Sequence, residues 1–224
     1  MEKNIVDGFI QEFSSFKSWA DQISDKDSPD WSDEYNNWAS FEKAVSDFIS
    51  NVEIESLSDL TIEGLIFSIA RDHEDEIFIE QIVKNKPLFQ KLIPHVIDSD
   101  EYWAKVEIAE WLGKNVIDTN ESENYLLELL ERGSFGLDTT ALTSLGKIAP
   151  ILAEEKAIEF WESKLLYKKY AALDVLSRVN SGRYSHYFKE ACMEGWLDQK
   201  TEKLTDDALK ALEEERKALG SVRE

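Results

Sequence analysis

The sequence predicts an all-α fold, a superhelical stack of antiparallel helix pairs with about twelve helices in 224 residues. One apolar pattern occurs three times, with steps of 33 and 31 residues, and a period of this size is typical of stacked helix pairs. The copies end as Ile108-Ala109-x-x-Leu112-Gly113, Ala141-Leu142-x-x-Leu145-Gly146 and Ala172-Leu173-x-x-Leu176-Ser177. Only 9 Gly and 4 Pro argue against an all-β fold, which needs many turn residues.

The first 55 residues are expected to form an aromatic-rich helical hairpin. The first stripe, on a helix over about residues 3–23, consists of Phe9, Phe13, Phe16 and Trp19. The second has the same offsets and consists of Trp31, Tyr35, Trp38 and Phe41. Ser28 is the expected N-cap of the second helix, with Pro29 at its first position. Such rings could line a ligand cage, but a stripe at helical spacing favours a buried core.

Helix-pair repeats are expected over residues 56–197. The expected pairs are 60–70 with 77–83, 102–113 with 123–131, 135–149 with 154–165, and 166–179 with 184–196, and a further short helix covers 85–96. Pro150 is expected to separate the two helices of its pair. Residues 198–224 supply a C-terminal capping helix, over about 202–219, with one charged face suited to the end of a stack. The whole chain, 1–224, is predicted to be one domain.

The Ala-Leu-x-x-Leu-Gly ending at 141–146 and its counterparts resemble HEAT-type α-solenoid repeats over about residues 60–197. The proline often found in the first helix of HEAT units is missing from all three copies, and so is a regular ladder of Asp and Arg. The resemblance implies a concave surface that binds protein or nucleic acid. One bacterial branch of such proteins excises alkylated DNA bases, but it needs a basic concave face, and this chain has the opposite charge.

The net charge of −21 is unevenly distributed. Residues 1–60 carry 14 acids and 4 bases, whereas residues 151–200 carry 8 of each. A field of this sign repels nucleic acid and anionic membrane surfaces, and it attracts a basic partner. The alternative is that the acidity only keeps the protein in solution. If a basic partner docks, we expect it on the acidic portion, from the N-terminus to about residue 150.

No residue cluster predicts catalysis, a cofactor or a metal. The densest polar segment, residues 71–76, could offer His73 and carboxylates to a divalent ion, but its pattern favours a loop and helix start. His95 and His186 have no nucleophile motif nearby. The single Cys192 excludes a disulfide framework and is expected to be a small core filler. The chain is therefore predicted to be no enzyme.

The basic residues of the third repeat are expected to balance acidic neighbours within the chain, although a second contact surface is the alternative. They are Lys164, Lys168, Lys169, Arg178, Arg183 and Lys189. The chain shows neither a signal peptide nor an apolar run of about 18 residues, so a cytoplasmic protein is expected.

The leading hypothesis is a non-catalytic solenoid, monomeric when free, that sequesters a basic protein and binds neither nucleic acid nor membranes. Its most concrete form is a bacterial immunity protein that neutralises a cationic toxin such as a nuclease. The alternatives are a scaffold or adaptor in a larger assembly, and a nucleic-acid-modifying HEAT-like enzyme. The expected partner-binding residues are Asp30, Trp31, Asp33, Glu34, Tyr35, Asp72, Glu74, Asp75, Glu76, Asp100, Glu101, Trp103, Glu107 and Glu110.

Overall fold

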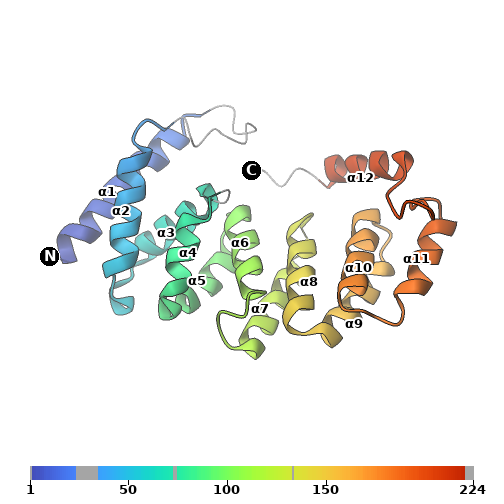
Figure 1. Ribbon diagram of the computed structural model, residues 1–224. Coiled ribbons are helices and arrows are strands. Elements are labelled where there is room, and N and C mark those ends of the chain that lie inside the picture. The colour runs from blue at the N-terminus through green and yellow to red at the C-terminus, as the bar shows by residue number, and fades with distance from the viewer. Residues whose placement is uncertain (1, 24–34, 73–74, 133, 220–224) are drawn as a thin grey trace. The chain divides into compact units, whose positions relative to one another are not determined.

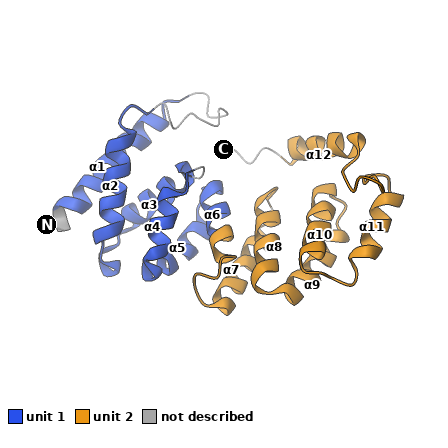
Figure 2. Cartoon of the chain, in the orientation of Figure 1, with its two compact units in different colours: residues 1–108, 224 blue, residues 109–223 orange. Residues whose placement is uncertain are grey.

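The structure, a computed structural model, describes residues 2–23, 35–72, 75–132 and 134–219. Over these residues the chain forms twelve α-helices and one short 3-10 helix, and its strand-like pairing is limited to an isolated bridge between Leu197 and Leu204 (Figure 1). The all-α prediction and the predicted number of helices are confirmed. The chain divides into two compact units, residues 1–108 and 109–223, with the boundary inside one helix (Figure 2). The single-domain organisation stays a prediction.

The first unit is built from two layers of helices. Its elements are α1 (Glu2–Ala20), α2 (Trp38–Asn51), η2 (Ile54–Ser56), α3 (Asp59–Arg71), α4 (Ile77–Lys84), α5 (Lys86–Asp98) and the first part of α6 (Tyr102–Leu112). Helix α1 packs against α2 and α3, α2 packs against α4, and α5 packs against both α3 and α4. Helices α1, α3 and α5 therefore form one layer, with α2 and α4 behind it.

Aromatic rings form the core of the first unit. The fully or almost fully buried members are Phe9, Phe13, Phe16, Phe41 and Phe48. The rings of Phe9 and Phe48 stack with centroids 4.4 Å apart, and those of Phe16 and Phe41 lie 4.8 Å apart. Gly64 lets α3 approach this cluster, because a Cβ atom there would lie 2.7 Å from the Phe9 ring. The interpretation of the aromatic stripes as core is confirmed for Phe9, Phe13, Phe16 and Phe41.

The predicted start of the second helix is wrong. Helix α2 begins at Trp38 and follows a turn at Asn36 and Asn37. Asparagine is a residue type that favours turns over helix interiors. Tyr35 lies before this turn, yet its side chain is buried with its ring centroid 4.8 Å from that of Phe16. Tyr35 therefore joins the core without belonging to the helix. The predicted cap Ser28, Pro29 and Trp31 lie outside the described residues.

The second unit continues as neighbouring helices. After the end of α6 its elements are α7 (Thr119–Glu131), α8 (Leu137–Ile148), α9 (Pro150–Trp161), α10 (Leu166–Arg178), α11 (Tyr184–Met193) and α12 (Asp206–Ala218). Each helix from α7 to α10 packs against the next one, and α8 also packs against α10. Helix α10 contacts both α11 and α12. The C-terminal helix thus lies on α10.

Two boundaries in this unit differ from the predicted ones. Helix α9 begins at Pro150, which stands at the first helical position, where its missing N–H leaves no hydrogen bond unmade. Helix α7 begins four residues earlier than predicted, at Thr119, because the Asp118 carboxylate accepts hydrogen bonds from the backbone N–H groups of Asn120 and Glu121. The start of α7 therefore follows from its N-cap and that of α9 from its proline, and neither follows from the apolar stripe.

The sequence repeat corresponds to a repeated contact. A Cβ atom on Gly113 would lie 2.7 Å from the Cβ atom of Ser144, and one on Gly146 would lie 3.6 Å from the side chain of Val175. Ser144 and Val175 each stand two residues before the last position of their own copy of the pattern. In both cases the last residue of one copy therefore contacts the next copy two positions before its end. The period of the sequence repeat is also the period of the helix packing.

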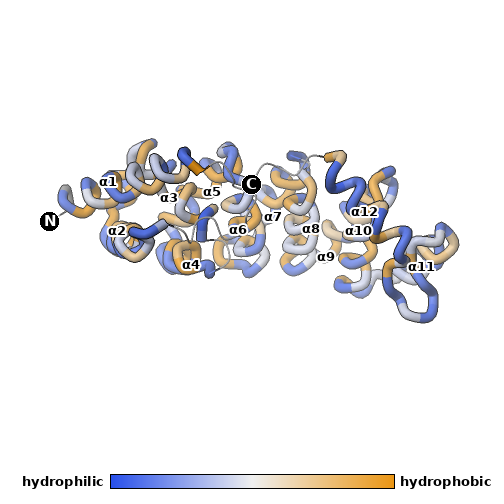
Figure 3. Tube along the Cα trace, turned by 90° about the horizontal axis from the view of Figure 1, so that it is seen from above, coloured by the Kyte–Doolittle hydropathy of each residue, from blue (hydrophilic) through white to orange (hydrophobic). Residues whose placement is uncertain are grey.

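Helix α12 is held on α10 by polar contacts as well as by packing. The carboxylate of Glu215 accepts hydrogen bonds from the backbone N–H groups of Leu166 (2.7 Å) and Tyr167 (3.0 Å), which lie at the start of α10. Among its apolar residues Ala208 is buried, whereas Leu209 is exposed. Long stretches of this helix are hydrophilic (Figure 3). A helix is thus present within the predicted range 202–219, and its capping role stays a prediction.

Candidate functional site

A groove of about 600 Å³ runs along α3 in the first unit, and we name it the α3 groove. Its floor and rims come from one face of α3, from the C-terminal end of α1, from the last turn of α5 and from the segment that joins α5 to α6. The lining residues are Lys17, Asp21, Asp59, Ile62, Glu63, Ile66, Phe67, Arg71, His95, Asp98, Ser99, Asp100 and Glu101. The α3 members recur at helical spacing, so the groove follows the helix along its length.

The floor of the α3 groove is apolar. Ile62, Ile66 and Phe67 lie on adjacent turns of α3 and keep 7%, 5% and 7% of their surface exposed. A helix whose apolar residues extend beyond its core-facing side can bury the additional residues against another element. Most of each side chain packs on the core, and the small part that stays open makes the floor a narrow apolar strip.

The rims of the groove are acidic. Six carboxylates line it, against the two cationic side chains of Lys17 and Arg71. Lys17 forms an ion pair with Glu63, and Arg71 forms one with Glu101, with Nη1 2.8 Å from Oε2. The remaining acids include Asp21, Asp59 and Asp100, whose side chains form no ion pair with any residue that the structure describes. The field in the groove is consequently negative.

Arg71 illustrates how this groove accommodates a cation. Its guanidinium carbon lies 4.5 Å from the centroid of the Phe67 ring, while its Nη1 and Nη2 atoms both face the carboxylate of Glu101. The arrangement combines a cation–π contact with a charge-assisted pair, both of which strengthen where water is partly excluded. An apolar strip bordered by carboxylates suits lysine and arginine side chains, whose stems are apolar and whose heads are charged.

The structure brings only two of the predicted partner-binding residues, Asp100 and Glu101, into the groove. The side chains of Tyr35, Asp72 and Glu107 are buried, with 6%, 4% and 5% exposed, and none of them lines the groove. Partner binding by the predicted residues stays a prediction. Five predicted residues lie outside the described part of the chain: Asp30, Trp31, Asp33, Glu34 and Glu74. The others, which do not line the groove, are Asp75, Glu76, Trp103 and Glu110.

Asp72 has a structural role at the junction of α3 and α4. Its Oδ2 atom accepts a hydrogen bond of 2.7 Å from the backbone N–H of Phe78, in the first turn of α4. Burial raises the pKa of Asp72 to about 7, against the lowering effect of this hydrogen bond, and the charges of Asp75 and Glu42 add to the rise. The interpretation of residues 71–76 as a loop and helix start is confirmed at Asp72. No group of three metal-ligating side chains converges within the described residues.

The groove also contains residues that the sequence analysis did not single out. Asp21, Asp59 and Glu63 line it, together with the apolar floor. The signal for the α3 part was present, because acidic and apolar residues alternate along 59–67 at spacings of three and four. Asp21 belongs to a segment 38 residues before Asp59, and only the packing of α1 on α3 brings the two into one groove.

The basic residues of the third repeat are largely paired within the second unit. The nitrogen–oxygen distances are 3.3 Å for Lys168–Asp138, 2.9 Å for Lys169–Glu194, 2.6 Å for Arg178–Asp174 and 3.8 Å for Arg183–Glu154. The expectation of balance within the chain is confirmed for these four side chains. This part of the molecule therefore offers less unbalanced charge than the α3 groove.

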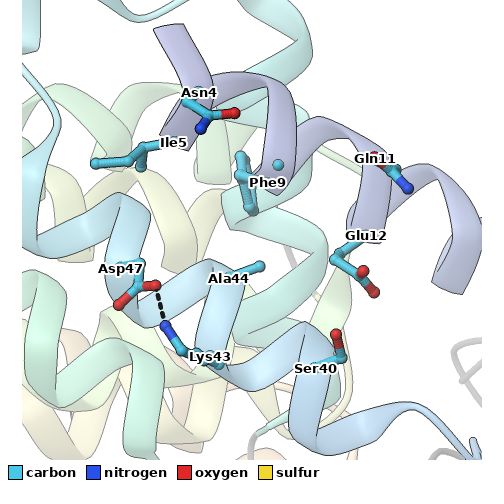
Figure 4. A pocket seen from close by; sticks show the side chains of 10 residues that line it. Asn4, Ile5, Phe9, Gln11, Glu12, Ser40, Lys43, Ala44 and Asp47 are labelled. Atoms are coloured by element: carbon cyan, nitrogen blue, oxygen red, sulfur yellow. Dashed lines mark hydrogen bonds and ion pairs between the residues drawn. The ribbon is translucent and has the colours of Figure 1, made fainter. Parts of the chain in front are cut away.

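Two further hollows differ from the α3 groove, because one has a smaller volume and the other has a more polar lining. The one between α1 and α2, of about 350 Å³, contains the ion pair of Lys43 with Asp47 and has Phe9 at its inner side (Figure 4). The other, of about 620 Å³, lies in the second unit beside Trp161 and His186. Neither combines an apolar strip with a surplus of one charge.

Cys192 is half-buried and not the core filler that the sequence predicts. The helix α11 to which it belongs ends one residue later, and the neighbouring Ala191 takes the buried position. Burial raises the pKa of the Cys192 thiol, and the charges of Asp198 and Glu202 raise it further. A raised pKa leaves less of the thiolate that a nucleophile requires.

No protein-family model matches the chain, and neither a curated protein nor a solved structure matches it. Within the described residues no helix has both the length and the apolar character that crossing a bilayer demands.

Proposed function

We propose that this chain is a non-catalytic, protein-binding helical repeat that sequesters a basic partner. The observation that supports this proposal is the α3 groove, in which an apolar strip of Ile62, Ile66 and Phe67 is bordered by carboxylates. The apolar strip stabilises a complex by removing hydrocarbon surface from water. The carboxylates select a cationic partner and accelerate its association, most strongly at low ionic strength.

The most concrete form of the proposal is a bacterial immunity protein for a cationic toxin such as a nuclease. A nuclease binds its substrate through Lys and Arg side chains that neutralise phosphates. Carboxylates such as Asp59 and Asp100, placed opposite those side chains, would cover them and block the substrate. Inhibition would then follow from occlusion and would need no chemistry from the inhibitor. The repeat class that we propose is the HEAT type, supported by the equivalent contacts of Gly113 and Gly146.

A salt-varied pull-down from the source organism, with mass spectrometry of the eluate, tests the proposal. The bait is the full chain, compared with a groove variant carrying Asp59→Asn and Asp100→Asn and with a control carrying Glu155→Gln and Glu214→Gln on exposed faces of α9 and α12. We expect a basic protein that is retained by the wild type and the control, is lost by the groove variant and elutes as salt rises. Retention of the same proteins by all three baits would contradict the proposal.

A toxin inhibitor and a scaffold give different results in the same experiment. An inhibitor captures one basic protein and suppresses its activity when the two are mixed, whereas an adaptor captures several proteins that co-elute. The scaffold alternative is favoured by the separate hollow beside Trp161 in the second unit, which would provide a second contact.

A further inference from the structure

The α3 groove follows one helix and has charged residues at both ends of it. Helix α3 has 13 residues, which corresponds to a length of about 20 Å. Asp59 is its first residue, and Arg71, its last residue, holds the Glu101 carboxylate beside it. Ile62, Ile66 and Phe67 lie between these ends. The groove, from Asp59 to Arg71, therefore has the length of about three to four turns of a second helix, and its apolar residues lie in its middle part.

We propose that the α3 groove binds one amphipathic cationic helix of the partner. Its apolar face, with residues at spacings of three and four, covers Ile62, Ile66 and Phe67, and its Lys and Arg side chains meet the carboxylates at the rims. This inference deepens the proposed function and rests on it. In this proposal the groove recognises a single helical segment of the basic partner.

The backbone of the groove favours a helix over an extended peptide. Extended peptides bind mainly by adding a strand to a sheet edge, where unpaired N–H and C=O groups receive them. The floor of the α3 groove is a helix whose interior N–H and C=O groups are bonded to one another. At its start a capping box of Ser58 and Thr61 also binds backbone N–H groups, so few backbone groups are left for an extended peptide. A helical partner bonds its own backbone and needs only side-chain contacts, which is what this floor offers.

Charge complementarity identifies the occupant as cationic. Asp21, Asp59 and Asp100 line the groove without an ion pair among the described residues, and they lie on three different segments. The two cations of the groove are already occupied by Glu63 and Glu101. These carboxylates would repel an acidic helix, and a neutral helix would leave their charge uncompensated. Lysine or arginine residues at the ends of a cationic helix would pair with them.

Direct binding to synthetic peptides tests this inference with the full chain. The first probe is a fluorescent peptide of about 14 residues, made of leucine and lysine with the leucines on one helical face. The second has the same composition in an order that places leucines all round the helix, and the third is oligolysine of equal charge. Anisotropy gives the affinity, and far-UV circular dichroism shows whether the bound peptide is helical.

We expect the amphipathic peptide to bind about tenfold more tightly than the reordered peptide and to become helical, because only it covers the whole apolar strip. The Asp59→Asn/Asp100→Asn variant should bind it several-fold more weakly at low salt, and the Glu155→Gln/Glu214→Gln control should equal the wild type. A second variant, Ile62→Thr, should reduce the preference for the amphipathic peptide, with its fold checked by circular dichroism.

The outcomes separate the two proposals. If all three peptides bind equally well and the groove variant weakens all of them, the helix is excluded and a basic partner is retained. If the groove variant and the control bind every cationic probe as the wild type does, the α3 groove is not the site, and both proposals are overturned. Because peptide order is changed without changing the protein, the helix test does not depend on the folding of any variant.

Discussion

The hydroxyl group of Tyr167 donates a hydrogen bond of 2.9 Å to Oδ2 of Asp138, a carboxylate that is fully buried. The same oxygen lies 3.3 Å from Nζ of Lys168, and Oδ1 accepts a hydrogen bond from the backbone N–H of Thr139. Burial raises the pKa of Asp138, and the Tyr167 hydroxyl and the Lys168 ammonium oppose this rise. The contact links α8 to α10, so a polar pair fixes two helices of successive repeats in an otherwise apolar interface.

Tyr167→Phe should therefore destabilise the protein. The substitution keeps the ring and removes the donor, which leaves a buried carboxylate with fewer partners, at a cost of roughly 1–3 kcal/mol in the free energy of unfolding. Urea denaturation followed by circular dichroism measures this cost. Tyr170→Phe is the matched control, because Tyr170 lies on the same helix with an exposed side chain. Equal stability of the two variants would show that the hydrogen bond to Asp138 contributes nothing.

The stability of the chain should fall between acidic and slightly basic pH because of Asp72. Its folded pKa, about 7, exceeds the ordinary value of 3.8, so the folded state holds a proton that the unfolded state has lost. The contribution of Asp72 to the free energy of unfolding is fully present below about pH 4 and is lost as the pH rises through 7. One pKa unit corresponds to about 1.4 kcal/mol, which gives a loss of roughly 2–3 kcal/mol between pH 5 and pH 8.

Asp72→Asn should remove this dependence. The amide oxygen can still accept the hydrogen bond from Phe78, while the charge that burial disfavours is absent. We expect the variant to be more stable than the wild type at pH 8 and to show a flatter profile of unfolding free energy against pH. Glu155→Gln, which removes an exposed carboxylate on α9 that has no part in the pKa of Asp72, serves as the control. A wild-type profile that stays flat from pH 5 to pH 8 would contradict the assigned pKa.

Glu215 should hold the C-terminal helix on α10. Its two carboxylate oxygens satisfy the N–H groups of Leu166 and Tyr167 at a helix start that has no side-chain cap of its own. Loss of such a cap costs about 0.5–2 kcal/mol. In Glu215→Ala the amides of Leu166 and Tyr167 should exchange with solvent faster than in the wild type. Glu214→Ala, one position away and exposed, should leave both rates unchanged, and equal rates in the two variants would argue against this role.

The elements that the sequence predicts correctly are those whose signal is local and repeated. Leu112, Leu145 and Leu176 recur at nearly constant spacing, and all three are fully buried. Their helices follow from periodicity alone. The start of α2 could not be predicted in this way, because the aromatic spacing continues through Tyr35 although the helix does not. There the buried contact of Tyr35 with Phe16 preserves the pattern without the helix.

The candidate site was harder to predict because it is assembled from distant segments. The ion pair of Lys17 with Glu63 spans 46 residues, and that of Arg71 with Glu101 spans 30. Acidic composition predicts the charge of the N-terminal portion but not which carboxylates line a groove. For Asp72 the run of polar residues predicts the helix start but not the burial of the side chain. Its burial depends on a backbone N–H six residues later, which composition does not reveal.

The same substitution at two equivalent repeat positions should have opposite effects. At Gly113 an added Cβ atom would lie 2.7 Å from the Cβ atom and 2.9 Å from the Cα atom of Ser144, so α8 itself would have to move. Overpacking of this kind costs typically about 1–3 kcal/mol, and we expect Gly113→Ala to lower the free energy of unfolding by this amount. Thermal and urea denaturation measure the effect.

At Gly146 the nearest atoms to an added Cβ atom, on Val175 and Val179, lie 3.6 Å away, which is ordinary contact. Gly146 is inside α8, where alanine is more favourable than glycine by up to about 1 kcal/mol. Gly146→Ala should therefore leave stability unchanged or increase it. The two variants serve as controls for each other, because both add one methyl group at the end of a copy of the repeat. Equal destabilisation by both would mean that the spacing between successive copies is the same, contrary to the contacts of Ser144 and Val175.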